Sequence, residues 1–336
     1  MAHNDKILQI LKEGDMDKHL QVLENSLQKV ENYLFNTLSG HKVEEHVNSM
    51  CMHVVRSGGK RIRPRLALAA AFALDIGIDE NQAVEFAAAI ELLHTATLIH
   101  DDVIDHAELR RGKSTLNATD GNHVAVLAGD YMFTRCFLAL QSLNNMRLFA
   151  AVNNSVTALV SGELKQLEKV GDLHINFDDY EATIYCKTGA LFEVAVTGMA
   201  IFSNQRQEII DALALYGKNL GIGFQVVDDM LDYSSSSEHL GKTVGEDLND
   251  GRITLPIIIT YQDLSSEDKI SFQKAVENKN LNEVLKFIDK TNALAKCQKY
   301  AERAINNAIE ALNILPSNPY KDSLINLALK AINRSF

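Results

Sequence analysis

Proline is scarce in this chain, and its scarcity limits what the chain can fold into. Only four prolines occur in 336 residues, at Pro64, Pro256, Pro316 and Pro319. Proline breaks helices because it lacks a backbone N–H and clashes with the preceding turn. Long stretches therefore contain no obligatory helix breaker, and many of these stretches are rich in Ala and Leu, which favour helix. The sequence predicts an almost entirely helical protein.

No linker, composition shift or short repeat divides the chain. We therefore expect a single all-helical domain over residues 1–336, in which residues 1–40 form helices for packing or dimer contacts. Residues 81–106 are apolar on nearly every side, which predicts a helix buried inside a bundle. A second long helix is predicted over residues 207–233. It contains glycines that usually mark the close approach of another backbone or a ligand, Gly217, Gly221 and Gly223.

Charge and cysteine content exclude several classes of protein. The net charge of −11 disfavours nucleic-acid binding and gives no attraction to an anionic membrane. The four cysteines, which are far apart and fit no metal-binding spacing, suit a reducing cytosol: Cys51, Cys136, Cys186 and Cys297. The start of the chain has charges in every apolar stretch, unlike a signal peptide. We therefore expect a cytoplasmic protein without a transmembrane segment.

Each long helix carries an Asp-Asp-x-x-Asp cluster near its C-terminal end. The six carboxylates are Asp101, Asp102, Asp105, Asp228, Asp229 and Asp232. Residues at this spacing project toward one side of a helix, where like charges raise one another's pKa unless a cation intervenes. Magnesium prefers oxygen ligands and commonly bridges carboxylate to phosphate, so the clusters predict two magnesium-binding faces that grip a phosphorylated ligand. Solvated helix ends are the alternative, which the helix dipole disfavours because it prefers cations there.

Within the first cluster the helical spacing separates two roles. Asp101 and Asp105 share a face and are expected to hold metal most directly. Asp102 is turned about 100° away and is expected to bond a metal-bound water or a neighbouring residue.

The segment RSGGKRIRPR predicts a second phosphate site that needs no metal. It gathers five basic residues without an acid, namely Arg56, Lys60, Arg61, Arg63 and Arg65. Gly58 and Gly59 let backbone amides approach an anion, and Pro64 is placed to open a helix whose N-terminus favours negative charge. An exposed basic loop is the alternative.

Other polar residues are ambiguous when taken alone. Arg110 and Arg111 are equally compatible with a helix C-terminal cap. His94 shares a face with Asp101 but in isolation is typical of a satisfied core histidine. Lys187, Thr188 and Gln225 are individually unremarkable. Further acids are expected to cap a helix or to form a loop face, namely Asp178, Asp179, Glu246, Asp247 and Asp250.

Taken together, these motifs resemble the trans-isoprenyl diphosphate synthases of the polyprenyl synthetase family. The resemblance runs in order through GGKRIRP, LHTATLIHDDVIDHAELRRGKST, YCKTGALFE, GFQVVDDMLDY and LGKTVGEDLNDGRITLP, over most of residues 50–260. It implies an all-α isoprenoid-synthase helical bundle around a deep central cavity. It also implies a homodimer, although heterodimeric members exist, and three magnesium ions with isopentenyl diphosphate and an allylic diphosphate as substrates.

The resemblance also implies roles for individual residues. Magnesium on the allylic diphosphate would be held by Asp101, Asp105 and, across the cavity, Asp228. The same diphosphate would contact Arg110, Lys187 and Lys242. Isopentenyl diphosphate would bind Lys60, Arg63, His94 and Arg111. Thr188 and Gln225 would lie beside the developing carbocation. Departures from the family pattern are slight: Arg252 stands where Lys is frequent, and Glu246 precedes the Asp247 of the loop motif.

Product length depends on the residues below the reacting carbon. Residues four and five before Asp101 are Thr97 and Ala96, where some short-chain members of the family carry aromatic rings. Small side chains would let a growing chain continue about 5.4 Å per helical turn toward Leu92, Leu93 and Ala89. We predict a medium-to-long all-trans product, with octaprenyl diphosphate for a respiratory quinone tail as the first choice.

Three other functions remain open from the sequence. The chain is also compatible with a shorter-chain geranylgeranyl or farnesyl diphosphate synthase. A class I terpene cyclase shares the acid clusters but is not expected to need GGKRIRP. A non-catalytic partner subunit is disfavoured because the second cluster is intact.

Overall fold

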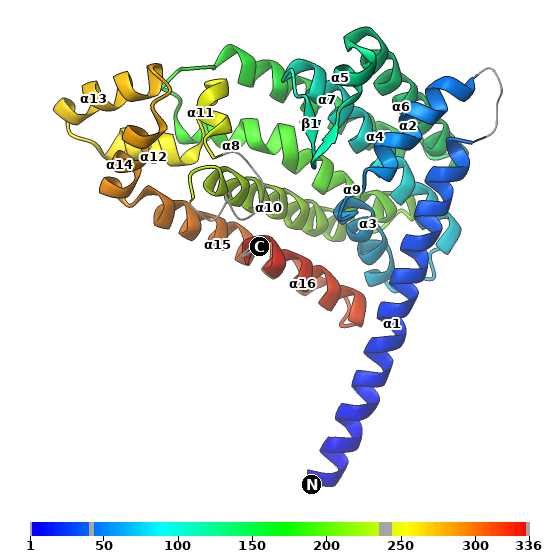
Figure 1. The fold of residues 1–336 in the computed structure, drawn as a ribbon. Helices are drawn as coiled ribbons and strands as arrows, with labels where there is room; N and C mark the ends of the chain where they lie inside the picture. The colour runs from blue at the N-terminus through cyan, green and yellow to red at the C-terminus, as the bar shows by residue number, and fades with distance from the viewer. Residues whose placement is uncertain (1, 40–43, 235–243, 334–336) are drawn as a thin grey trace. The chain divides into compact units, whose positions relative to one another are not determined.

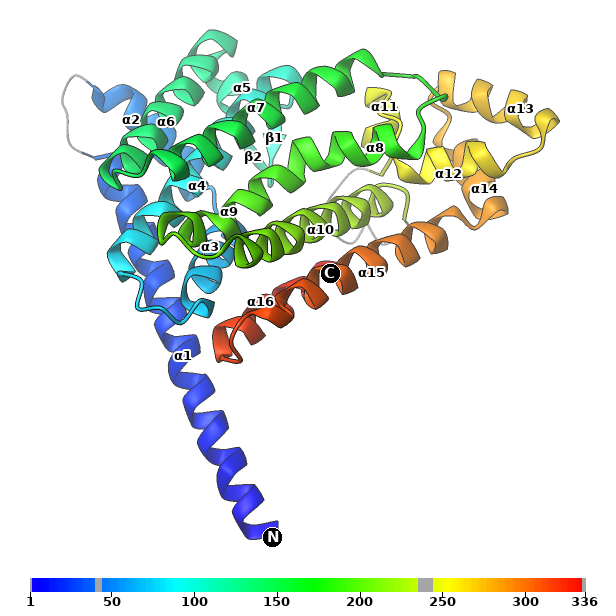
Figure 2. The same ribbon diagram turned by 180° about the vertical axis from the view of Figure 1, so that it is seen from behind.

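The computed structural model describes residues 2–39, 44–234 and 244–333, which are almost entirely helical (Figure 1, and from behind in Figure 2). The helices of the first half are α1 (Ala2–Thr37), α2 (Glu45–Arg56), α3 (Ile62–Ala73), α4 (Glu80–Ile104), α5 (Leu116–Asp120), α6 (Asn122–Ser142) and α7 (Met146–Glu168). The second half holds α8 (Phe177–Ile184), the π-helix η2 (Tyr185–Gly189), α9 (Ala190–Phe202), α10 (Gln207–Leu231), α11 (Glu246–Asp250), α12 (Leu255–Asp263), α13 (Ser266–Glu277), α14 (Leu281–Thr291), α15 (Ala293–Ala311), the 3₁₀-helix η4 (Leu312–Ile314) and α16 (Pro319–Ile332). The predicted all-α class is confirmed.

The chain divides into two compact units. Unit 1 comprises Met1–Val152, Ala195–Ile210 and Leu315–Leu324. Unit 2 comprises Asn153–Val194, Asp211–Ile314 and Ile325–Phe336. A single domain over residues 1–336 therefore stays a prediction.

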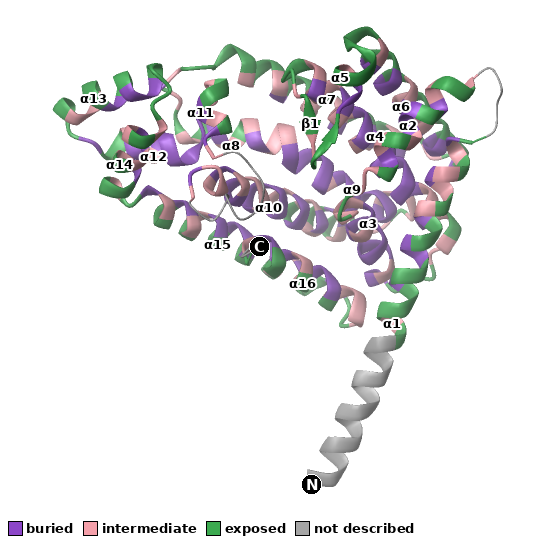
Figure 3. Ribbon diagram, in the orientation of Figure 1, coloured by how far each residue is buried: buried purple, intermediate pink, exposed green. Residues whose placement is uncertain are grey.

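Helix α4 forms the centre of unit 1, where it packs against α1, α3 and α6. It begins where the Asp79 side chain accepts the backbone N–H groups of Asn81 and Gln82, which satisfies two donors at the helix start. Most residues of α4 are buried, as its apolar sequence predicts. Its neighbour α3 is also buried along most of its length (Figure 3).

A short β-hairpin follows α4. Strand β1 (Leu109–Arg110) pairs antiparallel with β2 (Lys113–Ser114). The two turn residues, Arg111 and Gly112, have φ values of 54° and 74°. A two-residue hairpin turn with two positive φ values has the twist that suits flanking strands. The hairpin folds the chain back, so its arginines approach residues that precede it in the sequence.

Glycines allow unusually close packing in unit 2, as their positions in the sequence predicted. A Cβ added to Gly217 in α10 would lie 2.5 Å from the Cα of Glu193 in α9. A Cβ added to Gly221, one turn later, would lie 2.5 Å from the Cα of Gly189, the last residue of η2. Another backbone therefore occupies the space of the missing side chains, which fixes how η2 meets α10.

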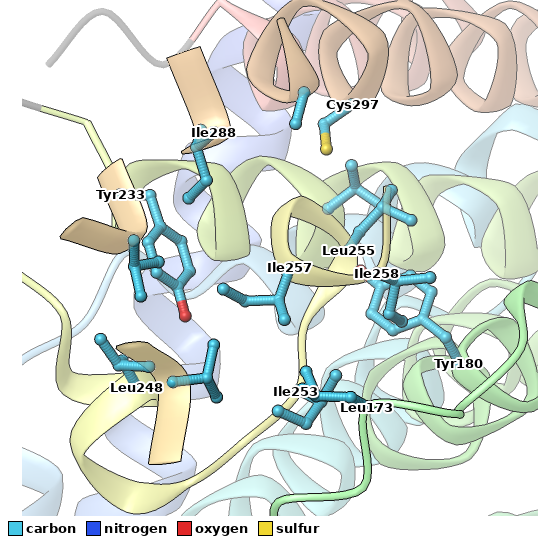
Figure 4. Close-up of a cluster of buried hydrophobic side chains, with 14 of the residues drawn as sticks. Leu173, Tyr180, Tyr233, Leu248, Ile253, Leu255, Ile257, Ile258, Ile288 and Cys297 are labelled. Atoms are coloured by element: carbon cyan, nitrogen blue, oxygen red, sulfur yellow. The ribbon is translucent and has the colours of Figure 1, made fainter. Parts of the chain in front are cut away.

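A buried apolar cluster in unit 2 lies beside this packing (Figure 4). Tyr180 of α8 contributes its ring to this cluster and is 4% exposed. Leu255 and Ile258 of α12 belong to the same cluster, as does Cys297 of α15. Helix α8 is therefore anchored by apolar burial, which holds its one buried phenol in place.

Three helices are long and apolar enough to cross a membrane by length and composition: Glu80–Ile104, Asn122–Ser142 and Phe177–Phe202. In the first and third, 72% of the most apolar window is buried within the protein, and in the second 39%. The sequence analysis had found no such segment, so the absence of a transmembrane helix stays a prediction.

We predict that Gly221→Ala destabilises the protein. Alanine favours helix over glycine by about 1 kcal/mol, yet its Cβ would collide with the backbone of Gly189. Overpacking of this kind costs about 1–3 kcal/mol, so the free energy of unfolding should fall in urea denaturation followed by circular dichroism.

Leu215→Ala on the exposed side of α10 is the matched control. Its free energy of unfolding should stay within about 0.5 kcal/mol of that of the unchanged protein. A Gly221→Ala protein as stable as this control would show that η2 and α10 are not tightly packed.

Candidate active site

The first aspartate cluster lies at the C-terminal end of α4, in unit 1. The backbone N–H of Asp105 donates to the carbonyl of Asp101 at 2.8 Å, so the two residues keep helical spacing. Asp102 is 6% exposed, and its Oδ1 accepts the Nε–H of Arg110 at 2.7 Å. Asp102 therefore pairs with a neighbouring arginine, while Asp101 is half-buried and Asp105 is exposed.

The hairpin delivers two arginines to this end of the unit. Arg110 reaches Asp102 from β1, and Arg111 donates from its guanidinium to the carbonyl of Gly58 in the basic loop. Neither arginine caps α4, because α4 ends at Ile104 and both side chains bond elsewhere. The hairpin turn thus joins the acidic cluster to the basic loop.

The basic loop is held by an internal ion network. Arg61 has a φ of 48° and precedes α3, which begins at Ile62 and not at Pro64 as the sequence predicted. The Arg61 guanidinium contacts Glu31 at 2.5 Å and Glu91 at 2.7 Å, and it donates to the carbonyl of Val55 at 2.8 Å. Glu91 is 4% exposed. A buried charge is tolerated when it is paired in this way.

His94 lies beside the same loop, as its position on α4 predicted. Its Nε2 is 3.0 Å from Nη1 of Arg63. Burial lowers the pKa of His94 well below its ordinary value, and four arginines lower it further: Arg63, Arg111, Arg110 and Arg61. His94 is therefore uncharged at neutral pH.

These groups surround a pocket in unit 1 that opens to solvent. The empty space in it, counted together with the part open to solvent, is about 610 Å³, and its lining includes Arg61, Glu91, His94, Asp102, Arg110 and Arg111. Cationic side chains outnumber carboxylates in this lining. A concave site of this charge suits an anion such as a diphosphate, without a metal ion.

The second cluster lies at the C-terminal end of α10, in unit 2. Asp229 is 4% exposed; its Oδ2 accepts the hydroxyl of Tyr180 at 2.6 Å, and its Oδ1 accepts Nε2 of Gln225 at 2.8 Å. Burial, together with the nearby carboxylates of Asp228 and Asp232, raises the pKa of Asp229 to about 7. Both oxygens of Asp229 are thus held by protein donors.

Asp232 has a different partner, the start of α11. Its carboxylate accepts the backbone N–H groups of Glu246 at 3.1 Å and Asp247 at 3.0 Å. The sequence analysis expected Asp247 on a loop face, but it lies half-buried in the first turn of α11. Burial and the charges of Asp229 and Asp232 raise its pKa. Arg252 lies 3.8 Å from Asp247 and offsets part of that charge.

The π-helix η2 presents the remaining polar residues of unit 2. Thr188 donates its hydroxyl to Oε1 of Gln225 at 2.8 Å, so these two predicted site residues are in contact. Lys187 bonds Gln166 at 2.7 Å and Glu163 at 2.8 Å. A π-turn of this kind is frequent at functional sites because it redirects side chains.

A second solvent-accessible pocket lies among these side chains, with a volume of about 710 Å³. It is lined in part by Tyr180, Lys187, Gln225, Asp229, Asp247 and Arg252. Of the predicted site residues of unit 2, Lys187, Gln225 and Asp229 line this pocket, whereas Thr188, Asp228 and Asp232 are not in its lining. Of those of unit 1, the other pocket is lined by His94, Asp102, Arg110 and Arg111, but not by Lys60, Arg63, Asp101 or Asp105.

The donor chemistry of the clusters fits a divalent metal ion. Carboxylates at this spacing repel one another, and a cation would offset that repulsion. Burial is the main cause of the raised pKa of Asp229, and the charges of Asp228 and Asp232 add to it. Among the residues that the structure describes, no group of three His, Cys, Asp or Glu side chains is close enough to hold a metal by itself. Oxygens from a substrate would therefore have to complete the coordination.

The predicted chain-length residues lie on α4 below the first cluster. Ala96 is fully buried, and so are Leu92, Leu93 and Ala89 on the preceding turns. Thr97 donates its hydroxyl to the carbonyl of His94 at 2.8 Å, so the group is turned back onto the helix. Lys60 is exposed in the basic loop. Lys242 lies outside the described residues.

Several partners of the site residues were missed from the sequence. Glu91 sits inside an apolar run, where a lone polar residue is easily taken for part of the core, and Tyr180 lies between acidic residues that gave no sign of its burial. Glu163 lies on the amphipathic helix α7, where acids are common on the exposed face. A glutamate at an otherwise apolar position of α4 was the one available signal, because a buried carboxylate requires a partner.

Comparison with known proteins agrees with the geometry. The family model described as polyprenyl synthetase matches residues 44–291. Octaprenyl diphosphate synthase of Escherichia coli (strain K12) is 39% identical over 292 residues, which cover 86% of this chain and 90% of that protein. A decaprenyl diphosphate synthase from Rhodobacter capsulatus has a TM-score of 0.88 at 32% identity, covering 96% of this chain and 99% of its own. A polyprenyl synthase from Caulobacter crescentus CB15, described as complexed with calcium and isoprenyl diphosphate, has a TM-score of 0.87 at 30% identity, covering 96% and 98%.

We predict that Tyr180→Phe destabilises unit 2 through Asp229. The substitution removes only the hydroxyl that donates to a carboxylate with 4% exposure. Loss of a donor to a buried charged group costs about 1–3 kcal/mol, measurable as a lower free energy of unfolding in urea.

Tyr300→Phe is the control, because its hydroxyl also donates to a carboxylate, Glu181, whose side chain is 33% exposed. Water can replace that donor, so the loss should stay below about 1 kcal/mol. Equal losses in the free energy of unfolding for Tyr180→Phe and Tyr300→Phe would show that the hydrogen bond to Asp229 stabilises the protein no more than the one to Glu181.

Proposed function

The chain belongs to the polyprenyl synthetase family, and from this we propose that it is a trans-polyprenyl diphosphate synthase. Such a prenyltransferase joins isopentenyl diphosphate head to tail to an allylic diphosphate in isoprenoid biosynthesis. The observation that carries the proposal is the cationic pocket of unit 1, which adjoins an aspartate cluster and suits a diphosphate without metal. A site for a second, metal-free diphosphate is what a two-substrate condensation needs.

The chain's residues divide between the two proposed substrates. Lys60, Arg63, His94 and Arg111 serve isopentenyl diphosphate. Arg110, Lys187 and Lys242 serve the allylic diphosphate. Cationic side chains aimed at a leaving diphosphate stabilise the charge that develops as its carbon–oxygen bond breaks. Thr188 and Gln225, held together by their hydrogen bond, lie beside the carbon that becomes positive.

Magnesium is the proposed metal, with about three ions per site. Asp102, Asp229 and Asp232 are held by protein groups. From the family resemblance we assign the direct metal contacts to Asp101, Asp105 and Asp228. Bound there, divalent ions neutralise negative charge on the departing diphosphate. The other three carboxylates keep their clusters in position.

Octaprenyl diphosphate is the proposed product, made from farnesyl or geranylgeranyl diphosphate as starter. Its octaprenyl group would become the side chain of a respiratory quinone. Support comes from the small side chain of Ala96 and from relatives that make long chains, the octaprenyl and decaprenyl diphosphate synthases. Product length is set by the first large side chain that a growing tail meets.

We also propose a cytoplasmic homodimer. Helix α6 is apolar, yet much of it is solvent-exposed in one chain, with Leu127 66% and Leu138 52% exposed. A second copy of this chain is the occupant that would bury such a face symmetrically.

The central test incubates purified protein with magnesium, isopentenyl diphosphate and an allylic starter of ten, fifteen or twenty carbons. Chromatography of the products should show a long all-trans chain, and removal of the metal with EDTA should abolish turnover. Light scattering of the same preparation should give twice the mass of one chain.

Other outcomes would assign a different function. Products of fifteen or twenty carbons indicate a shorter-chain synthase. Diphosphate release from the allylic substrate alone indicates a terpene cyclase. Inactivity of the purified chain with every starter indicates a partner subunit.

We predict that larger side chains at position 96 shorten the product. In the series Ala96→Val, Ala96→Leu and Ala96→Phe, each increase in volume should stop elongation earlier, because the tail passes along α4 toward Leu92. If the Ala96→Leu and Ala96→Phe proteins unfold, the Ala96→Val protein by itself still tests the prediction.

Asn81→Phe is the control, since it adds the same ring at an exposed position in the first turn of α4. Its product should be unchanged. Identical product lengths across the Ala96 series would disprove a tail path along α4.

A further inference from the structure

The ammonium group of Lys187 is held from one side by helix α7. Its Nζ lies 2.8 Å from Oε2 of Glu163 and 2.7 Å from Oε1 of Gln166. Glu163 and Gln166 are three residues apart on α7, a spacing that places two side chains on the same face of a helix. All three residues belong to unit 2, so the contacts form within one compact unit.

The backbone determines where this contact forms. A Cβ added to Gly162, the residue before Glu163, would lie 2.6 Å from the Cβ of Cys186 and 3.1 Å from the backbone nitrogen of Lys187. The backbones of α7 and η2 therefore approach each other closely at the point from which Glu163 and Lys187 extend. Packing of the two helices thus sets the distance between the two charged groups.

Other cations that line the pocket of unit 2 have carboxylate partners nearby in the sequence. Lys169 contacts Asp172, three residues later, and Arg252 contacts carboxylates of the segment just before it. Lys187 has its carboxylate on a different helix, and the two side chains of the Lys187–Glu163 pair are only 25% and 16% exposed. Solvent and salt screen such a pair less than an exposed one.

The carboxylate of Glu163 does not take the place of a ligand. Lys187 and Gln166 line the pocket of unit 2, whereas Glu163 is not in its lining. An ammonium has three N–H donors and no acceptor, and among the described residues two of these donors meet oxygens of α7. This arrangement leaves the third N–H for an oxygen atom in the pocket.

A carboxylate behind Lys187 can contribute position but not positive charge. It offsets part of the charge of the ammonium, which by itself weakens the attraction to an anion. A lysine side chain has several rotatable bonds, however, and fixing them before a ligand binds removes an entropic cost of binding. Position also affects the rate, because a displacement of about 1 Å can slow a reaction about 100-fold.

We infer that Glu163 is a positioning residue, which together with Gln166 holds the ammonium of Lys187 where it meets the departing diphosphate of the allylic substrate. The inference rests on the proposed function for the identity of that diphosphate. The contacts of Lys187 with α7, and its place in the lining of the pocket, rest on the geometry of unit 2. Glu163 acts through Lys187 and does not itself contact the substrate.

Three substitutions separate the position of the carboxylate from its charge. Glu163→Gln keeps the length and an acceptor oxygen without the charge, Glu163→Asp keeps the charge on a side chain one methylene shorter, and Glu163→Leu removes both. In single-turnover reactions of the full-length protein with magnesium and both substrates, the rate constant should stay within about threefold for the Gln variant and fall about 10- to 100-fold for the Asp and Leu variants. The concentration of isopentenyl diphosphate that gives half the maximal rate should not change, because the proposed site for that substrate is in unit 1.

A double-mutant cycle tests whether Glu163 acts through Lys187. The Lys187→Met protein lacks the ammonium, so the addition of Glu163→Asp should slow its reaction no further. Glu168→Asp is the matched control, because it shortens an exposed glutamate of the same helix. Its rate constant should stay within about twofold of that of the unchanged protein.

Binding of an unreactive allylic analogue provides a readout that needs no turnover. Farnesyl thiodiphosphate, in which sulfur replaces the bridging oxygen, keeps the diphosphate but ionises slowly. In calorimetry with magnesium, the unchanged protein and the Gln variant should bind it equally well, and the Asp and Leu variants should bind it about tenfold more weakly. If the Lys187→Met protein reacts too slowly to measure, the cycle is carried out on this binding.

The outcomes distinguish this inference from the proposed function. Equal rate constants for the Gln and Asp variants would overturn the inference, as would additive losses in the cycle or failure of the unchanged protein to bind the analogue. If the Leu variant does not unfold cooperatively, the comparison of the Gln and Asp variants decides. Prenyl transfer that is equally fast in all the Glu163 variants would reject the inference and support the proposed function. The predicted order of analogue binding without any prenyl transfer would support the inference and reject the proposed function.

Discussion

Repulsion among clustered carboxylates is the constraint on which the candidate site depends. Each Asp-Asp-x-x-Asp cluster places negative charge at the end of a helix, where the helix dipole also disfavours it. A different kind of group stabilises the carboxylate in each case. Arg110 from the hairpin pairs with Asp102, a buried phenol and an amide hold Asp229, and backbone amides of α11 hold Asp232. At least one carboxylate in each cluster is thus held in position by protein donors.

In unit 2, close packing permitted by glycine also helps to hold the aspartate cluster in position. Gly221 lets the backbone of η2 come within van der Waals contact of α10, and this contact brings Thr188 to Gln225. Gln225 in turn donates to Asp229, so a single chain of hydrogen bonds runs from the π-helix to the aspartate cluster. Because apolar burial anchors Tyr180 at the far end of this chain, a buried core and a polar network stabilise each other.

In unit 1 the charge of the pocket depends on which arginines are paired with carboxylates, more than on the number of arginines. The basic loop and the hairpin bring several cations to one pocket. Repulsion among these cations would destabilise the protein if no anion were near them. Glu91 and Asp102 neutralise two of the arginines, and His94 contacts a third as an uncharged ring. Selective neutralisation of this kind leaves a pocket that is positive toward a ligand while its structural charges are balanced within the protein.

The helical class, the two long helices and the spacing of the aspartate clusters were predictable from the sequence, because helical spacing is local geometry. The pocket residues His94, Arg110, Lys187 and Gln225 were ambiguous alone, and only the family resemblance pointed to them. The shared face of Asp101 and Asp105 follows from i and i+4 alone. The partners were not predictable. Tyr180 and Asp229 are 49 residues apart in the chain, and only the packing of α8 against α10 brings them to 2.6 Å. Likewise it is the hairpin that brings Arg110 to Asp102. Sequence determined which chemistry the chain carries, and tertiary packing decided which of its charges are balanced inside the protein, since that depends on contacts between residues distant in the chain.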